Sequence, residues 1–405
     1  MTRPPEMVCP VLPYGRQHIS QDDIAAVCRV LESDLITQGP LVGQFEDAVA
    51  NHCGASYAVA VNSATSALHL ACLALEVGEG DLVWTTPNTF VASANCARYC
   101  LANVDFVDID PRTYNMSAKA LSIKLKNAQA NGLPLPKVVV VVHFAGQPCD
   151  MRVFSRLADI FGFRIIEDAS HAIGATCREE PVGSSQYSDI TVFSFHPVKI
   201  ITTCEGGMAM TNDSLLAERL RLLRSHGIVR PKPEHAKASD EPWAYEQVLL
   251  GHNYRMTDVH AALGLSQMQR LDDFVNWRHE LADRYSRELA QLAFELPFQA
   301  SHSRSALHLY PIMVPKSSNQ RAERLSLYKF LKDNGLGVNV HYIPVHTQPF
   351  YQALGFTWGD FPEAESYYER TITLPLFGSM TLTEQDRVIG LLHDYDAKAE
   401  SRLAA

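Results

Sequence analysis

Several common features are missing from this sequence, and each absence excludes a class of protein. No C-x-x-C pair occurs among its nine cysteines, and their number is odd, so neither a zinc site nor a disulfide framework is indicated. No apolar run approaches the roughly 20 residues that a membrane-spanning helix needs. The N-terminal stretch MTRPPEMVCPVLPYGRQ has no apolar signal core. We therefore expect a cytoplasmic protein with no membrane partner and no metal.

Basic residues are also in deficit. The chain has 35 Lys and Arg residues against 45 Asp and Glu residues, a net charge of −10, and the acidic residues are scattered. Proteins that bind nucleic acid rely on clustered Lys and Arg side chains, so no nucleic-acid partner is expected. A phosphorylated ligand would have to be bound by local groups instead.

The length and the apolar pattern predict two α/β domains. A chain of 405 residues is too long for one typical core. We place a large domain, which opens with an irregular arm at 1–19, at 1–245, and a smaller one at 246–405. The polar stretch 226–243 is expected to be a surface loop. Strand-like and helix-like segments alternate in the large domain, and runs such as VVVVVHF are apolar without a polar face.

Such alternation predicts a mostly parallel sheet covered by helices on both faces, with ligands at the carboxyl ends of its strands. The expected strands are 57–61, 81–85, 104–108, 138–144, 163–168 and 189–195, and the expected helices are 20–33, 42–53, 66–75 and 90–99.

Small and hydroxylated residues follow the first expected strand. The stretch NSATSA, which begins at Asn62, lies at the start of a helix. Free backbone amides and the positive end of the helix dipole bind anions at such a position, so a phosphate would fit there. An ordinary N-cap gives the same pattern.

A carboxylate follows the strand FRIIE. Burying Asp168 at the end of a strand is costly unless a cation pairs with it, and a protonated pyridine ring would be such a cation. A structural Asp that caps a turn is the alternative. His171 either lies against such a ring or is an interior histidine with its hydrogen bonds satisfied.

Lys199 is the strongest candidate for catalysis. It follows the strand DITVFSF within SFHPVK and precedes ITTCEGG, which is apolar and glycine-bearing text. Desolvation lowers the pKa of a lysine and makes the neutral, nucleophilic amine available for Schiff-base formation. The alternative is a solvated surface charge. The order of phosphate site, acid and lysine on successive strand ends favours catalysis.

These motifs resemble the DegT/DnrJ/EryC1/StrS family of sugar aminotransferases, over essentially the whole chain. The stretches that carry the resemblance are NSATSALHLA, EDASHAIG, SFHPVKIITTCEGG, GHNYRMTDVHAALG and VNVHYIPVH. The resemblance implies the fold type I of transferases that depend on pyridoxal 5′-phosphate (PLP), and a homodimer with shared active sites. SHAIG, SFHPVK-IITT and HNYR favour the branch that makes UDP-4-amino-4,6-dideoxy-N-acetyl-β-L-altrosamine in pseudaminic acid biosynthesis. That branch moves an amino group from L-glutamate to C4 of UDP-2-acetamido-2,6-dideoxy-β-L-arabino-hexos-4-ulose.

The resemblance also implies roles for individual residues. Lys199 would form the Schiff base and Asp168 would pair with the pyridine nitrogen, and with His171 these are the expected catalytic residues. The expected phosphate ligands are the Ala64 and Thr65 amides, the Ser194 hydroxyl and Asn253 of the partner subunit, while Phe90 would stack on the ring. The residues expected to face the sugar nucleotide are Tyr14, Asp34, Leu35, Ile36, Thr37, His341 and Tyr342. Cys204 departs from the family, where many relatives have Gly or Ala before EGG.

Other functions remain open. A sugar dehydratase of the same family would carry His in place of Lys199, and an aminotransferase for another keto sugar, linked to UDP or dTDP, would differ in only a few side chains. A regulator without enzyme activity would usually add a DNA-binding domain. An NAD-linked oxidoreductase needs G-x-G-x-x-G after its first strand, where this chain has NSATSA. A visible spectrum separates a PLP enzyme from an NAD-linked enzyme or a scaffold without cofactor, because PLP bound to lysine absorbs visible light, whereas product analysis is needed to identify the keto sugar.

Overall fold

The computed structural model describes residues 11–229 and 243–403, with side chains up to Lys398. The helices are α1 (Gln21–Leu31), α2 (Pro40–Cys53), α3 (Ala64–Ala74), α4 (Ala92–Tyr99), α5 (Ala118–Ala130), η1 (Phe144–Gly146), α6 (Met151–Phe161), α7 (Ser214–Arg224), α8 (Asp258–Met268), α9 (Leu271–Glu288), α10 (Gln320–Asp333), η2 (Val345–Thr347), α11 (Pro349–Gln352), α12 (Pro362–Arg370) and α13 (Leu382–Leu403). The strands are β1 (Leu12–Pro13), β2 (Tyr57–Val61), β3 (Leu82–Thr85), β4 (Asn103–Phe106), β5 (Val138–Val142), β6 (Arg164–Asp168), β7 (Thr176–Cys177), β8 (Glu180–Pro181), β9 (Ile190–Ser194), β10 (Gly207–Thr211), β11 (Ile228–Val229), β12 (Glu246–Gln247), β13 (Ser303–Arg304), β14 (Tyr310–Met313), β15 (Leu336–Gly337) and β16 (Thr371–Leu374).

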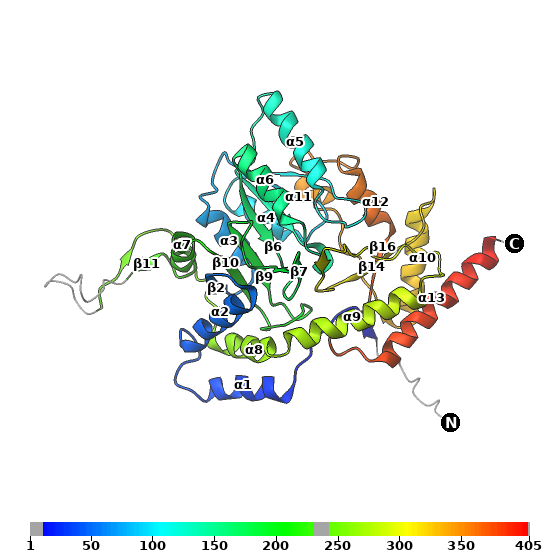
Figure 1. The fold of residues 1–405 in the computed structure, drawn as a ribbon, viewed down its shortest axis with the longest axis horizontal. Helices are drawn as coiled ribbons and strands as arrows, with labels where there is room; N and C mark the ends of the chain where they lie inside the picture. The colour runs from blue at the N-terminus through cyan, green and yellow to red at the C-terminus, as the bar shows by residue number, and fades with distance from the viewer. Residues whose placement is uncertain (1–10, 230–242, 404–405) are drawn as a thin grey trace.

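A seven-stranded sheet in the order β2-β10-β9-β6-β5-β3-β4 forms the centre of the molecule (Figure 1). The pairs from β9 through β4 are parallel, whereas β10 runs antiparallel to both of its neighbours. This confirms the predicted α/β class and its mostly parallel sheet. β10 was not among the expected strands.

Local signals account for the ends of the first helices. Ser20 caps α1 in a reciprocal capping box with Asp23, as its position before QDD predicts. Gly54 ends α2 in the left-handed conformation, with φ of 73°. α3 begins at Ala64, two residues before the predicted start, so the NSATSA stretch itself forms the first turn.

The second half of the chain builds a separate apolar core. It gathers side chains from α9, α10, α13, β14 and β16, and Leu12 of β1 joins it. α8 packs instead against α1 and α2, and α9, α10 and α13 extend to the right of the sheet in Figure 1. The domain boundary near 245 stays a prediction.

Two expectations fall partly outside the described residues. Of the loop expected at 226–243, the part at 230–242 is not described, and the residues before it form the β11–β12 pair with 246–247. Of the arm at 1–19, residues 1–10 are not described, and β1 pairs with β15. No helix in the described part of the chain is long and apolar enough to cross a membrane.

Candidate active site

A cavity of about 510 Å³ lies at the carboxyl ends of the central strands. Most of the predicted site residues line it: Tyr14, Ala64, Thr65, Phe90, Asp168, His171, Ser194, Lys199, His341 and Tyr342. They come from segments far apart in the sequence, and the parallel sheet brings the ends of β2, β6 and β9 to one edge.

The floor of this cavity is the first turn of α3. The Ser63 hydroxyl accepts a hydrogen bond from the Ser66 amide at 3.1 Å. The Ala64 and Thr65 amides have no intrahelical partner, because they lie in the first turn of the helix. Gly207 of β10 packs directly behind this turn, because a Cβ at Gly207 would lie 2.5 Å from the Ala64 nitrogen. The turn is thus a rigid cradle of donors for an anion.

Asp168 is buried and faces the cavity from the end of β6. The Ser93 hydroxyl donates to Oδ2 at 2.6 Å, and the Ser170 hydroxyl and amide donate to Oδ1 at 2.5 and 3.1 Å. No ion pair joins Asp168 to any side chain in the described ranges. The carboxylate is held by neutral donors and is available to a cationic ligand.

Lys199 lies in the turn after β9 and lines the same cavity. Burial lowers the pKa of Lys199 to about 8, against the opposing effect of the Asp168 carboxylate. Its amine is therefore far easier to deprotonate than that of an ordinary lysine, as an amine nucleophile requires.

Aromatic and imidazole rings form the remaining wall. The ring of Phe90 is 58% exposed, an unusual placement for phenylalanine that leaves its face free for a ligand. His341 is hydrogen-bonded at both ring nitrogens, by Asn339 Nδ2 at 3.4 Å and Thr373 Oγ1 at 2.8 Å. Its ring packs 5.0 Å from that of Tyr14. His341 therefore presents its ring, rather than a free nitrogen, to the cavity.

Two groups of predicted residues are not in this cavity. Asp34 and Leu35 line a different one, of about 660 Å³, between α1, α2 and α8. Asn253 is exposed, and Ile36 and Thr37 also lie outside the wall of the Lys199 cavity. The turn at 36–37 contacts the start of α8, because Thr37 pairs with Thr257 and the Asp258 amide donates to the Ile36 carbonyl at 3.0 Å, whereas Asn253 pairs with Ser225.

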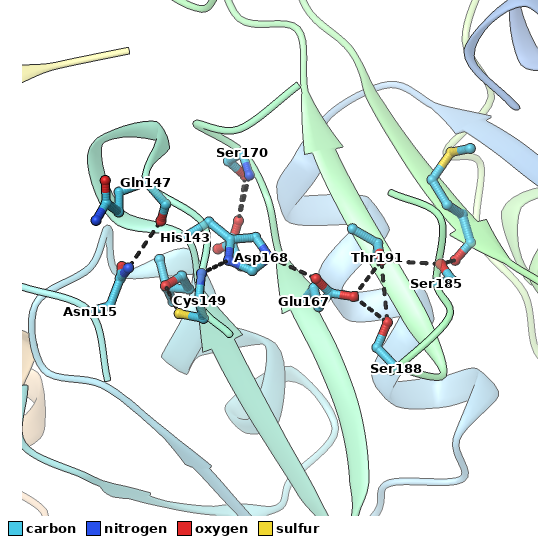
Figure 2. Close-up of polar contacts among 12 residues, drawn as sticks. Asn115, His143, Gln147, Cys149, Glu167, Asp168, Ser170, Ser185, Ser188 and Thr191 are labelled. Atoms are coloured by element: carbon cyan, nitrogen blue, oxygen red, sulfur yellow. Dashed lines mark hydrogen bonds and ion pairs between the residues drawn. The ribbon is translucent and has the colours of Figure 1, made fainter. Parts of the chain in front are cut away.

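A second polar network, which was not predicted from the sequence, lies beside Asp168 (Figure 2). Glu167 Oε2 pairs with His143 Nε2 at 2.7 Å, and Oε1 accepts from Ser188 and Thr191. Burial raises the pKa of Glu167, but these hydrogen bonds outweigh burial and hold the pKa below its usual range. The polar pair Glu167-Asp168 at the end of an apolar strand was the available signal.

Cys204 is exposed and has a φ of 66°, a left-handed conformation that glycine adopts without strain. The exposed thiol therefore does not crowd the turn after Lys199.

Comparison with known proteins decides the family. Residues 17–393 match the family model described as the DegT/DnrJ/EryC1/StrS aminotransferase family. The chain belongs to this family. The predicted family, fold class and aminotransferase class are confirmed, and so is pyridoxal phosphate as the cofactor of the family.

Two curated relatives of this aminotransferase cover nearly all of it. The spore coat polysaccharide biosynthesis protein SpsC of Bacillus subtilis is 40% identical over 387 residues, which cover 95% of this chain and 96% of SpsC. The UDP-4-amino-4,6-dideoxy-N-acetyl-beta-L-altrosamine transaminase of Campylobacter jejuni is 37% identical over 378 residues, covering 92% and 94% of the two chains.

Solved structures share the whole fold. Helicobacter pylori PseC, described as an aminotransferase involved in the biosynthesis of pseudoaminic acid, superposes with a TM-score of 0.86 at 29% identity, covering 96% of this chain and 100% of PseC. The PLP form of Spr1654 from Streptococcus pneumoniae gives 0.85 at 29% identity, covering 96% and 99%.

The residues present fit pyridoxal phosphate. The amides of the α3 turn and the Ser194 hydroxyl suit its phosphate, and the unpaired carboxylate of Asp168 suits a protonated ring nitrogen. Lys199 supplies an amine of lowered pKa on the same cavity.

Proposed function

We propose that this aminotransferase uses PLP to move an amino group from L-glutamate to C4 of UDP-2-acetamido-2,6-dideoxy-β-L-arabino-hexos-4-ulose, in the cytoplasm. The observation that carries the proposal is the joint placement of Lys199 and Asp168 on one cavity whose floor is the α3 cradle. The name of the Campylobacter relative and the description of PseC support the UDP sugar and the pseudaminic acid pathway.

When bound, PLP supplies an electrophilic carbon and an electron-withdrawing ring. Asp168 would hold a proton on the ring nitrogen, and the cradle and Ser194 would hold the phosphate. Lys199 would bind the cofactor, and its Nζ would take up the proton from the carbon that carries the amine and give it back during transfer. Phe90 would cover the face of the ring. We assign His171 a supporting role, and place Tyr14, His341 and Tyr342 against the sugar nucleotide.

We further propose a homodimer in which each active site is shared. Asn253 and the turn 34–37 were both expected at the site, and none of them lines the Lys199 cavity of its own chain. Asn253 is exposed, and the turn carries the exposed side chains of Leu35 and Ile36, each 52% exposed, so both are accessible to a second subunit. A partner subunit brought against these residues would receive Asn253 at its phosphate.

A second candidate is an aminotransferase for another nucleotide-linked keto sugar. The observation that favours it is the 40% identity to SpsC, whose name places it in spore coat polysaccharide biosynthesis. Both candidate functions use the same PLP site, and they differ only in the sugar that receives the amino group.

Product analysis tests the proposal. The holoenzyme is incubated with L-glutamate and, separately, with the proposed UDP sugar and a panel of UDP- and dTDP-linked 3- and 4-keto sugars, and products are identified by mass spectrometry and NMR. We expect amination at C4 of the proposed sugar, absent with Lys199→Ala. Activity on dTDP sugars alone would favour the second candidate.

A further inference from the structure

His171 is held by two hydrogen bonds of different kinds. Its Nδ1 lies 3.3 Å from the backbone nitrogen of Ala145, and its Nε2 lies 3.1 Å from the Tyr342 hydroxyl. A backbone amide can only donate, so Nδ1 must be an unprotonated acceptor. A neutral imidazole then carries its proton on Nε2. Burial, with the nearby Lys199 and His341, lowers the pKa of His171 well below its usual value, which keeps the ring neutral.

The Ala145 amide is aimed at His171 by an unusual turn. Ala145 has a φ of 58°, in the left-handed region that residues with a side chain rarely adopt. Gly146 follows with a φ of 92°, and a Cβ there would lie 2.9 Å from the His171 carbonyl oxygen and 2.9 Å from the Leu307 nitrogen. The Ala306 amide donates to the Gly146 carbonyl at 3.0 Å and fixes the turn. Strain of this kind persists where the surroundings enforce it, and it is concentrated at functional sites.

Tyr342 connects this arrangement to the cavity. Its hydroxyl lies 3.1 Å from Nε2 of His171, and the two rings are nearly parallel, with an interplanar angle of 20°. The phenol oxygen accepts a hydrogen bond from Nε2–H, so the O–H proton of Tyr342 must point away from His171. His171 is the hydrogen-bond partner of the Tyr342 hydroxyl among the described residues, and Tyr342 lines the cavity opposite Phe90, at 6.2 Å between ring centroids.

We infer that the Nε2–H tautomer of His171, fixed by the Ala145 amide, orients the Tyr342 hydroxyl as a hydrogen-bond donor into the cavity, toward the carbonyl oxygen of the keto substrate. His171 and the 144–146 turn are then positioning residues, and Tyr342 is the group that touches substrate. The choice of substrate group rests on the proposed function, whereas the tautomer follows from the hydrogen bonds alone.

A donor at this place distinguishes substrate from product. A ketone oxygen can only accept a hydrogen bond, while the ammonium group that replaces it can only donate. The O–H proton of Tyr342 can therefore be donated to the keto sugar, whereas it finds no acceptor on the ammonium group of the aminated product. This favours binding of the acceptor and release of the product from the same site.

Nitrogen NMR of the holoenzyme tests the tautomer. The ¹⁵N shifts of protonated and unprotonated imidazole nitrogens are well separated, and a protein labelled at histidine, compared with His171→Gln, assigns the His171 signals. We expect a protonated Nε2 and an unprotonated Nδ1. Tyr342→Phe should shift Nε2, whereas Tyr14→Phe, also at the cavity but packed on His341, should not. Ala145→Gly, which keeps the amide and relieves the strain, should preserve the tautomer. A proton on Nδ1, or on both nitrogens, would overturn the inference.

Stopped-flow absorbance follows the two half-reactions separately and tests the donor role. Tyr342→Phe should lower kcat/KM for the keto-sugar half-reaction about tenfold, as expected for the loss of one hydrogen bond. The L-glutamate half-reaction should stay within about twofold of wild type. An equal loss in both halves, or none in the sugar half, would contradict a contact with the ketone. If wild type failed to react with the UDP sugar, the proposed substrate would be wrong, and the NMR result would still decide the tautomer.

Discussion

Asp168 and Glu167 are adjacent in β6, yet their side chains serve opposite sides of the sheet. Asp168 faces the cavity and is held by Ser93 and Ser170, whereas Glu167 pairs with His143 at 2.7 Å in a separate buried network (Figure 2). Alternation along a strand produces this division. The Asp168 carboxylate is available to a ligand. The Glu167 carboxylate links β6 to His143 and to Thr191 of β9, and so stabilises the strand end that carries Asp168.

This division predicts different phenotypes for two similar substitutions. Asp168→Asn keeps the shape but removes the charge, so kcat should fall by roughly two to three orders of magnitude while the cofactor stays bound, as when other preorganised charges are removed. Steady-state kinetics and the visible spectrum measure both effects. Near-normal turnover would mean that Asp168 is structural.

Glu167→Gln is the matched control. It leaves His143 without its anionic partner and should lower the free energy of unfolding by about 2–4 kcal/mol, with kcat of the folded enzyme nearly unchanged. The folded-state pKa of Glu167 is below its unfolded value, so its contribution is present above the unfolded pKa and disappears as pH falls through the folded one. Denaturant melts from pH 7 down to pH 3 should show the two proteins converging in acid. A constant difference would contradict this.

The reactivity of Lys199 should follow a pKa of about 8. Its amine loses the proton as pH rises through this value, so about a tenth is neutral at pH 7, against roughly 0.04% for an ordinary lysine. Competitive acylation of the cofactor-free protein between pH 6 and 11, read by mass spectrometry, gives the titration of each lysine, with exposed lysines as the internal standard. A midpoint near 10.4 would mean that burial does not activate Lys199.

Gly207 should be essential for the cradle. Gly207→Ala places a Cβ 2.5 Å from the Ala64 nitrogen, so we expect cofactor affinity at least ~10-fold lower and a loss of about 1–3 kcal/mol in stability. Gly43→Ala is the control, since nothing lies within 4 Å of its Cβ inside α2, and it should stabilise by about 0.5–1 kcal/mol. Equilibrium titration with PLP and thermal melts check both. Unchanged affinity in Gly207→Ala would show that the cradle tolerates displacement.

Mixed dimers test the shared site. Lys199→Ala and Asn253→Asp should each be impaired alone. After the two proteins are unfolded and refolded together, one site of each mixed dimer carries both changes and the other carries none, so activity should return. If Asn253 served its own subunit, both sites would stay damaged and mixing would restore nothing.

Features that depend on short stretches of sequence were predicted correctly. The apolar strands 57–61, 138–144 and 189–195, the capped α1 and the order of cradle, acid and lysine all follow from short stretches, and the sheet brings them together as expected. β10 was missed because GMAMT begins with glycine and has no β-branched residue before its final threonine, so it lacks a distinctive strand signal. The Glu167–His143 pair joins residues from two strands, and its formation depends on which strands become neighbours.

The residues at 34–37 and Asn253 show a further limit. Their expected role came from resemblance, and a single chain does not bring them to Lys199. A role for them at the site therefore depends on the proposed second subunit, and contacts between subunits leave no periodic pattern in the sequence of one chain.

Reduction with borohydride followed by peptide mapping identifies the lysine that binds the cofactor. Borohydride makes the bond between PLP and its lysine permanent, and digestion then releases the modified peptide. We expect one pyridoxyl group per chain, on Lys199 within SFHPVK, and none in Lys199→Ala. A label on another lysine, or no label on a protein saturated with PLP, would contradict it.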